Sequence, residues 1–384
     1  MTRRRILVVG MLDSIHLARW IEAIDVTQCE ITLFPSGPHR RLHPRVRELA
    51  RGKSIDFQTR GPLPGVSLLI WVLDTCFGLG IRRRWFRRVL ISEAPALIHA
   101  MEMQHAGYMV ERILQGVVQP PTFMLTLWGS DINWFKTKGR HVDRMRHVLE
   151  RTDILVAECR RDLDAAAHLG FVGRQIHFLA LTGGIDEEYG AASQPFPTLE
   201  HRHEICLKGY SGFMGRAPLA LRATVRVLRS SQGWRLTVYA ASWRVAWLSY
   251  WFRWRHCLNI AVHRKGSLTD QEIRAMFARS RIAVMISYSD GFPASLKEAI
   301  LFGSIPVMAA TSCAREVFGA DMGPIEIGDP SLESIGDAVV RLMSSAVGLD
   351  DRAFGSREEL LRRFQQSEFR RRVNTAYTDA LMTP

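Results

Sequence analysis

Two carboxylates that could bind hydroxyl groups stand eight residues apart in the chain. In "SDGFPASLKEAI" (289–300), Asp290 follows an apolar run, and Glu298 lies in the segment that begins after Pro293. The apolar run predicts a buried strand, and a proline suits the first turn of a helix. We therefore expect one acid where a strand ends and the other on the next helix. The alternative is that Asp290 only caps this helix and Glu298 is a surface residue.

The residues between the two acids are expected to present backbone N–H groups. Gly291, Phe292 and Ala294 would stand at the helix start, where amides lack partners within the helix. A polyol can accept hydrogen bonds from such amides and donate to a carboxylate. A sugar nucleotide offers hydroxyls on its sugar and on its ribose, so one acid is predicted near the sugar and the other at the ribose.

A glycine-rich turn earlier in the chain could hold a diphosphate. The segment "LKGYSGFMGRAPLALRA" (207–223) joins a predicted strand to a predicted helix, and its last glycine, Gly215, precedes Arg216. Exposed amides, a helix N-terminus and a guanidinium all favour phosphate binding. Lys208 is a second candidate cation.

Two histidines follow predicted strands in the first half of the chain. His16 lies in "GMLDSIHLARW" and His105 in "MEMQHAGYMV". An imidazole in such a loop can hydrogen-bond a ligand or act as a base. The alternative for His16 is a histidine on the helix surface.

A further turn, "WGSDI" (128–132), follows another strand-like run. It contains Trp128, Ser130 and Asp131. The Asp131 carboxylate could accept hydrogen bonds from acceptor hydroxyls, or it could cap the next helix. We expect all three residues on the acceptor side of a ligand cleft.

The elements that must position these residues follow from the alternation of strand-like and helical patterns. Strand-like runs cover 5–10, 29–34, 96–100, 122–127, 153–158 and 175–181, and then 204–209, 234–240, 258–262, 281–287, 305–309 and 324–328. Such runs are typical of buried parallel strands. A polar passage at 183–204 separates the two sets. The predicted fold class is α/β, with two Rossmann-like domains facing across a cleft that the strand ends line.

The domain prediction divides the chain into three ranges. Residues 1–185 form an N-terminal domain on the acceptor side, and residues 186–356 form the domain that binds a nucleotide. Residues 357–384 read as a terminal helix.

Composition narrows the class of partner. The net charge of +13 is carried mainly by arginine. This charge favours binding to anionic substrates or to an anionic membrane surface. The alternative is that the arginines only form a solvated protein surface. The chain has no helix-turn-helix, zinc-finger or RNA-binding signature, so we expect no nucleic acid partner.

The first loop lacks G-x-G-x-x-G, which argues against a dehydrogenase. Six scattered cysteines with no C-x-x-C predict a reduced, cytoplasmic protein.

Two segments have a membrane interpretation. Residues 63–81 approach spanning length, but Asp74 in their middle favours a buried or interfacial helix. The segment "WRVAWLSYWFRWRHCLNI" (243–260) mixes tryptophan with arginine, which suits the inner face of a cell membrane. The alternative is an ordinary helix whose tryptophans cover the second sheet.

The chain resembles the retaining family-four glycosyltransferases of the GT-B fold. Their signature, E-x7-E followed by A-x-x-x-G-x-P-V, is matched by Asp290, Glu298 and "AILFGSIPV" (299–307). "WGSDI" and "GGID" (183–186) also fit. "SDGFPAS" and "TSCARE" (311–316) point to a branch with an SDG variant of the motif.

The resemblance implies specific roles. Glu298 would hold the ribose of a nucleotide diphosphate sugar, Asp290 with the amides of residues 291–294 would hold the transferred sugar, and Arg216 would neutralise the departing diphosphate. The acceptor would be a hydroxyl, such as one on a lipid-linked glycan, in cell-surface polysaccharide or glycolipid synthesis. The reaction would proceed with retention and need no metal or other cofactor. The terminal helix would return to the first domain.

The sequence departs from this family at three positions. The first acid is Asp290 rather than glutamate, Leu221 stands where a second phosphate-binding cation is usual, and Trp128 replaces a histidine. Three alternatives therefore stay open. One is an inverting enzyme that uses His16 as its base. The others are an inactive module that acts as an assembly or membrane partner, and a different enzyme of the same fold, such as an epimerase or phosphorylase.

Overall fold

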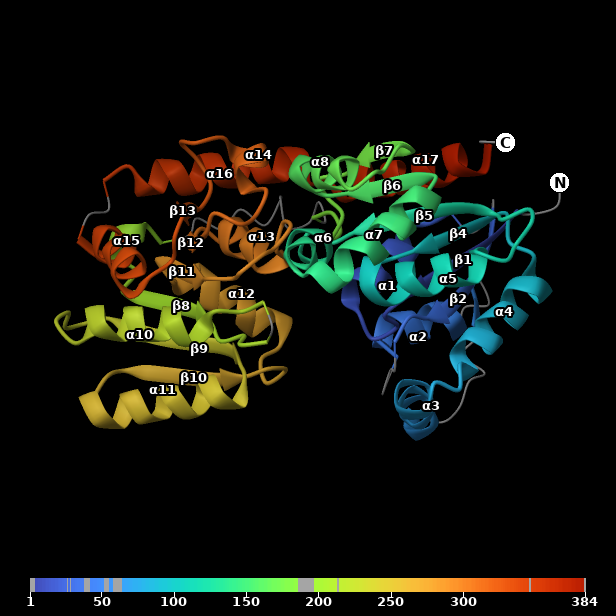
Figure 1. Ribbon diagram of the computed structural model, residues 1–384. Coiled ribbons are helices and arrows are strands. Elements are labelled where there is room, and N and C mark those ends of the chain that lie inside the picture. Colours follow the sequence, from blue (N-terminus) through green and yellow to red (C-terminus); the bar gives the residue numbers. More distant parts are fainter. Residues whose placement is uncertain are drawn as a thin grey trace. The chain divides into compact units, whose positions relative to one another are not determined.

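The computed structural model describes residues 4–25, 27, 29–37, 42–51, 55–57, 64–185, 197–212, 214–344 and 347–382. The chain divides into two compact units (Figure 1): unit 1 is Met1–Gly184 with Gln366–Pro384, and unit 2 is Ile185–Gln365. The predicted first boundary lies one residue from the observed one. The predicted division at 356/357 falls inside helix α16 (Leu349–Arg363), which stays in unit 2. Residues 186–196 of the predicted linker, including Asp186 of "GGID", lie outside the described residues.

Unit 1 is a parallel sheet covered by helices. Its strands are β1 (Arg4–Gly10), β2 (Cys29–Pro35), β3 (Ile55–Phe57), β4 (Leu97–Ala100), β5 (Thr122–Leu127), β6 (Ile154–Ala157) and β7 (Arg174–His177). Its helices are α1 (Ile15–Ala23), α2 (Pro44–Arg51), α3 (Pro64–Phe77), α4 (Ile81–Glu93), η1 (Met103–Gly107), α5 (Tyr108–Leu114), α6 (Ser130–Asn133), η2 (Phe135–Thr137), α7 (Gly139–Arg151), α8 (Arg160–His168) and α17 (Gln366–Met382). The strand order is β3-β2-β1-β4-β5-β6-β7.

Unit 2 repeats this architecture. Its strands are β8 (Glu204–Lys208), β9 (Arg235–Ala241), β10 (Ile260–Arg264), β11 (Ile282–Met285), β12 (Ile305–Ala309) and β13 (Ile325–Ile327). Its helices are η3 (Leu199–His201), α10 (Ala217–Leu228), α11 (Trp243–His256), α12 (Asp270–Arg279), α13 (Ala294–Leu301), α14 (Ala314–Phe318), α15 (Leu332–Ser344) and α16. The strand order is β10-β9-β8-β11-β12-β13. The central strands are buried on both faces, which explains why they read as continuous apolar runs.

The strand order places one switch point in each sheet. In unit 1 the order reverses between β1 and β4, and in unit 2 it reverses between β8 and β11. At such a point the two outgoing loops diverge and leave a crevice outside the carboxyl ends of the strands. The loops that carry the predicted site residues are therefore brought together by topology within each unit.

Helix α17 completes the core of unit 1. The Trp20 indole lies edge-on to Phe369, with 6.1 Å between ring centroids, and Phe178 packs against the same phenylalanine. At the surface of this contact the Asn374 carboxamide accepts the Asp25 N–H at 2.7 Å. The terminal helix predicted from residue 357 is thus two helices, and the one that packs on unit 1 begins at Gln366.

Asp74 has a structural explanation that the sequence did not reveal. Its two carboxylate oxygens accept the backbone N–H groups of Ile81 and Arg82 at 2.7 and 2.9 Å, and so satisfy the start of α4. The end of α3 is not buried, since Phe77 is 70% exposed. None of the described helices is both long enough and apolar enough to cross a bilayer.

Candidate functional site

The two loops at the switch point of unit 2 are joined through their backbones. Gly215, before α10, forms an antiparallel bridge with Ser287, after β11. The Arg216 N–H donates to the Ile286 carbonyl at 3.0 Å, and the Tyr288 N–H donates to the Met214 carbonyl at 2.8 Å. The glycine-rich turn and the segment that carries Asp290 therefore form one structure.

Glycine is required at position 215 by this close approach. A Cβ atom there would lie 2.0 Å from the carbonyl oxygen of Tyr210, a backbone atom that no side-chain rotation can move. Gly209 is similarly constrained, because its Cβ would lie 2.7 Å from the Ala241 Cα. These glycines are predicted from the sequence to expose amides, and in the structure they also allow the turn to close.

A small pocket opens where the two loops meet. It has a cavity volume of about 70 Å³, which suits part of a ligand rather than a whole nucleotide. Its lining comprises Lys208, Tyr210, Met214, Gly215, Met285, Ile286, Ser287, Asp290, Pro293 and Ser295. The Lys208 ammonium lies 3.0 Å from the Ser295 hydroxyl, so a cation from β8 reaches the start of α13. Four predicted residues thus share one pocket: Lys208, Gly215, Asp290 and Pro293.

Asp290 lies in the turn after β11 and does not cap α13. The N-cap position belongs to Pro293, one residue earlier than predicted, and no side chain caps the helix. The Asp290 carboxylate accepts its neighbour's amide, Gly291 N–H, at 3.1 Å. The segment after β12 supports this turn, because the Cys313 N–H donates to the Gly291 carbonyl at 3.3 Å. The helix-cap alternative for Asp290 is therefore wrong.

Two further amide-bearing residues of the turn have clear positions. Phe292 is buried and stacks on Phe364, with 4.8 Å between ring centroids, so its side chain anchors the turn in the core. Ala294 is the first residue of α13. The N–H groups at this helix start are among those that an α-helix leaves without internal partners.

Glu298 is half-buried on α13 rather than exposed. It lies close enough to the buried Tyr239 of β9 to act on its ionisation: burial raises the pKa of Tyr239 well above its ordinary value, and the Cys206 thiol and the Glu298 carboxylate raise it further. Glu298 therefore belongs to the same end of the sheet as the pocket.

Arg216 stands at the N-cap position of α10. Its guanidinium donates to the Pro330 carbonyl at 3.0 Å and lies 4.9 Å from the centre of the Tyr288 ring. These contacts hold the charge at the helix start. They use one of several N–H donors, so the same group can also bind a phosphate.

The loops after three strands of unit 1 converge in the same way. His16, in the first turn of α1, is half-buried, and its ring lies 5.5 Å from the Trp128 ring. The Trp128 indole N–H donates to the Met101 carbonyl after β4 at 2.7 Å. The surface-histidine alternative for His16 does not hold, because the side chain packs against this tryptophan.

Asp131 is buried beneath these loops and positions them. It accepts the N–H of Trp128 at 2.9 Å and that of Met103 at 3.4 Å. Burial raises the pKa of Asp131 to about 7, opposed by the Trp128 hydrogen bond and assisted by the Asp162 and Glu102 carboxylates. Gly129, not Asp131, occupies the N-cap of α6, and Ser130 is its first residue.

Glu102 is a buried acid that the sequence analysis missed. Its carboxylate accepts the Ser36 hydroxyl hydrogen at 2.8 Å. Burial raises the pKa of Glu102, while the neighbouring His105 imidazole lowers it. His105 itself is exposed on η1. Glu102 could have been identified from the sequence by its position. It stands two residues after a predicted strand, and site residues of parallel sheets gather at the carboxyl ends of strands.

An Asp-x-Asp sequence occurs on α8, at residues 162–164. Asp162 is buried, and its carboxylate accepts hydrogen bonds from Arg161 and Asn133. It thus takes part in the packing of α6 and α8. Among the described residues there is no group of three or more His, Cys, Asp or Glu side chains able to hold a metal ion.

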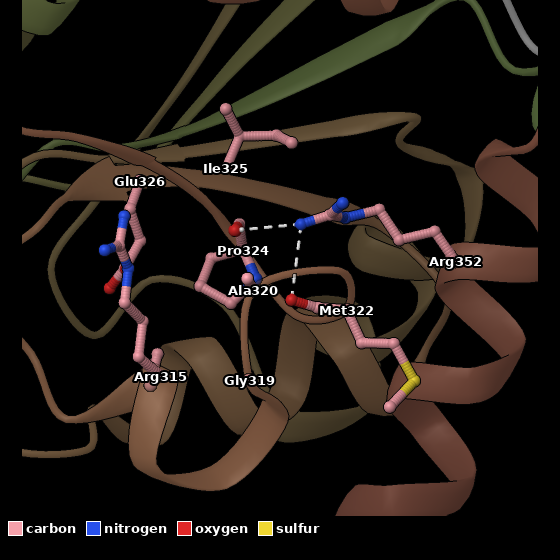
Figure 2. Close-up of a pocket in the computed structure, with 9 residues that line it drawn as sticks. Arg315, Gly319, Ala320, Met322, Pro324, Ile325, Glu326 and Arg352 are labelled. Carbon is pink, nitrogen blue, oxygen red and sulfur yellow. Dashed lines mark hydrogen bonds and ion pairs between the residues drawn. The ribbon is translucent and has the colours of Figure 1, made fainter.

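A larger pocket, of about 230 Å³, lies beside β13, an edge strand of the unit 2 sheet (Figure 2). The charged side chains that line it already have partners within the protein. Arg315 pairs with Glu326 at 2.5 Å, and Arg352 donates to backbone carbonyls of the segment 321–324 at 2.9–3.2 Å. We therefore place the candidate site at the smaller pocket.

Comparison with known proteins rests on structure. No family model and no curated protein matches the chain. The solved structures that are similar to it include sucrose-phosphate synthase from Thermosynechococcus elongatus, at 10% identity and a TM-score of 0.72, with both chains covered completely. A glycosyltransferase from Rickettsia africae has 12% identity and a TM-score of 0.66, again with complete coverage. Anabaena HepE in complex with UDP-glucose has 10% identity and a TM-score of 0.64, covering 98% of this chain and 99% of its own. The chain therefore has the two-domain GT-B fold.

Proposed function

We propose that the protein is a glycosyltransferase that moves a sugar from a nucleotide diphosphate sugar to an acceptor hydroxyl. The observation that carries the proposal is the pocket at the switch point of unit 2, where Lys208, Gly215 and Asp290 meet. The shared fold supports it, since HepE, one of the similar structures, was crystallised with UDP and with UDP-glucose.

Each residue has a role that its surroundings allow. Glu298, on α13, accepts hydrogen bonds from the ribose. Asp290 accepts from hydroxyls of the transferred sugar, while the amides at the start of α13 donate to the same sugar. Lys208 and Arg216, with the amides of the glycine-rich turn, bind the diphosphate.

The bond changes explain why the cations matter. The acceptor oxygen forms a bond to the anomeric carbon, and the bond from that carbon to the diphosphate oxygen breaks. The electron pair leaves with the diphosphate, and the acceptor hydroxyl gives its proton to an oxygen of the departing diphosphate in a retaining reaction, or to a base such as His16 in an inverting one. Negative charge therefore grows on the diphosphate in the transition state. Fixed cations and amides stabilise that charge without reorganising, which is how electrostatic catalysis lowers a barrier.

We propose retention of the anomeric configuration, which rests on the resemblance to the retaining family. Inversion is the second candidate, in which His16, half-buried in the first turn of α1, acts as the base that deprotonates the acceptor hydroxyl. Analysis of the product anomer by NMR separates the two. An α-linked product from an α-linked donor supports retention, and a β-linked product supports inversion.

The test of the main proposal is a panel of nucleotide diphosphate sugars read first by thermal shift and then by turnover. We expect one donor to raise the melting temperature and to be consumed when acceptor is added. Candidate acceptors are glycolipids and lipid-linked glycans of cell-surface polysaccharide synthesis, offered at the cytoplasmic face of a membrane. Binding without turnover of any acceptor would favour an inactive module. The proposal would be refuted if no donor raised the melting temperature and no donor was turned over.

A further inference from the structure

Helix α11 carries its apolar surface on the outside. Five aromatic side chains on it are largely exposed: Trp243 at 71%, Trp247 at 67%, Tyr250 at 50%, Trp251 at 42% and Trp254 at 77%. Exposed tryptophan is uncommon, and five such aromatics on one helix form a contiguous patch rather than scattered residues. We call these five residues the aromatic face.

The spacing of these residues puts them on one side of the helix. They occupy positions i, i+4, i+7, i+8 and i+11, which at about 100° per residue fall within an arc of about 100°. The opposite side of α11 packs against the core of unit 2. Val245, Ala246 and Ser249 are buried, and Leu248 and Phe252 pack on the core of unit 2. The aromatic face is therefore not needed to cover the sheet.

Arginines flank the aromatic face on both sides. Arg244 and Arg255 lie beyond one edge of the arc and Arg253 beyond the other, and all three are exposed. The helix contains no acidic residue. In Figure 1, α11 lies beside β10, an edge strand of the unit 2 sheet.

We propose that the aromatic face of α11 binds an anionic lipid bilayer. Tryptophan and tyrosine rings favour the boundary between lipid headgroups and acyl chains, and arginines beside them bind anionic headgroups. This inference does not depend on the proposed sugar transfer, because none of the five residues of the aromatic face lines the pocket and vesicle binding is tested without turnover.

Two other occupants fit less well. A second copy of the chain in a two-fold dimer would bring the same arginines toward each other, which costs binding energy. A neutral glycan would gain nothing from the positive charge of the flanking arginines, and α11 contains no Asp, Glu, Asn or Gln to accept hydrogen bonds from its hydroxyls.

The test is co-sedimentation of the full chain with vesicles of phosphatidylcholine alone or mixed with phosphatidylglycerol, at low and high salt. We expect binding to the anionic vesicles that weakens as salt rises. The double variant Trp247→Gln/Trp254→Gln should lose at least tenfold in vesicle affinity. The triple variant Arg244→Gln/Arg253→Gln/Arg255→Gln should lose about a hundredfold, since each basic residue near a charged membrane is worth about fivefold.

Matched controls keep the result specific to this helix. Phe354→Gln removes an exposed aromatic side chain from α16, and Arg222→Gln/Arg226→Gln/Arg341→Gln removes three exposed arginines from α10 and α15. Both should bind vesicles nearly as well as the unaltered protein. Because every changed side chain is exposed, thermal melts should show that all variants fold.

Four results would overturn the proposal. The first is a failure of the unaltered protein to bind anionic vesicles, and the second is equal binding to neutral ones. The third is undiminished binding by the α11 variants, which would move the membrane contact elsewhere, for example to the exposed end of α3. The last is a lipid-independent dimer in analytical ultracentrifugation that the tryptophan variant loses, which would make the face a contact between copies.

Discussion

The Trp20 indole N–H donates a hydrogen bond to the Tyr377 hydroxyl at 2.9 Å, although 357 positions separate the two residues. The same hydroxyl lies 2.7 Å from His99 Nδ1, and His99 Nε2 lies 2.7 Å from the Thr126 hydroxyl. Tyr377 accepts from Trp20, and both ring nitrogens of His99 have a hydroxyl partner. A buried chain of bonds thus ties α17 to α1, β4 and β5.

The first prediction concerns this chain of bonds. Tyr377→Phe removes the shared hydroxyl and leaves the Trp20 N–H and the His99 nitrogen buried without it, at about 1–3 kcal/mol for each unsatisfied group. We expect the free energy of unfolding to fall by roughly 2–4 kcal/mol in urea denaturation. Tyr250→Phe, at an exposed tyrosine, is the control and should change it by less than about 0.5 kcal/mol. Equal losses in the two variants would contradict the network.

The second prediction is acid sensitivity caused by His99. Burial lowers the pKa of His99 to about 3, whereas an unfolded histidine titrates near about 6.5. Between these values the unfolded chain binds a proton that the folded chain does not. The free energy of unfolding should therefore fall as pH falls from about 6.5 to 3, by about 1.4 kcal/mol per pH unit from this residue.

The measurement is urea denaturation across that pH range in the unaltered protein and in His99→Gln. We expect the variant to show a flatter profile by that amount. His147→Gln, at an exposed histidine, should keep the slope of the unaltered protein. Parallel profiles for all three proteins would show that His99 does not titrate in this way.

The third prediction separates Asp290 from Glu298. Glu298→Ala should weaken binding of free nucleoside diphosphate roughly ten- to a hundredfold, since each hydrogen bond to a carboxylate is worth about 1.5–3 kcal/mol. Asp290→Ala should leave that binding nearly intact, because the ligand lacks the sugar, while turnover falls sharply. Calorimetry and a turnover assay provide the two readouts.

Asp337→Ala, at an exposed carboxylate of α15, is the control for this pair and should change neither readout. Loss of nucleoside diphosphate binding in Asp290→Ala alone would mean that the roles are exchanged. Unchanged turnover in both site variants would remove the pair from the site.

The fourth prediction tests the closed turn at Gly215. Gly215→Ala places a Cβ against the Tyr210 carbonyl, so the turn must open and the bridge to Ser287 must break. We expect more than a tenfold loss of donor affinity together with lower thermal stability. Gly328→Ala is the matched control, since a Cβ there meets nothing within 4 Å. Full donor affinity in Gly215→Ala would show that the bridge is dispensable.

The alternation of strands and helices was predictable because buried parallel strands leave continuous apolar runs, and Asp290 was placed at a strand end for that reason. The contact between Trp128 and Met101 could not be predicted, because it depends on which strands are neighbours in the sheet. The break between α16 and α17 could not be predicted from the sequence either. No glycine or proline marks it, and it occurs where the Phe364 carbonyl accepts the N–H of Ile185, far away in the sequence. The exposure of α11 needed the structure, since tryptophans on a helix can cover a core or face outward.

The return of α17 has a consequence for how the protein is made. A ribosome releases the strands of unit 1 first, but Trp20 and His99 must wait for Tyr377 until all of unit 2 has been translated. At about 5–20 residues per second, the roughly 180 residues of unit 2 take about 10–40 s. During that interval the side chains of Trp20 and Phe178 lack the contacts that Phe369 makes with them in the folded protein. We expect trigger-type chaperones to engage the growing chain there, and messages cut short before codon 366 to yield products that proteases clear.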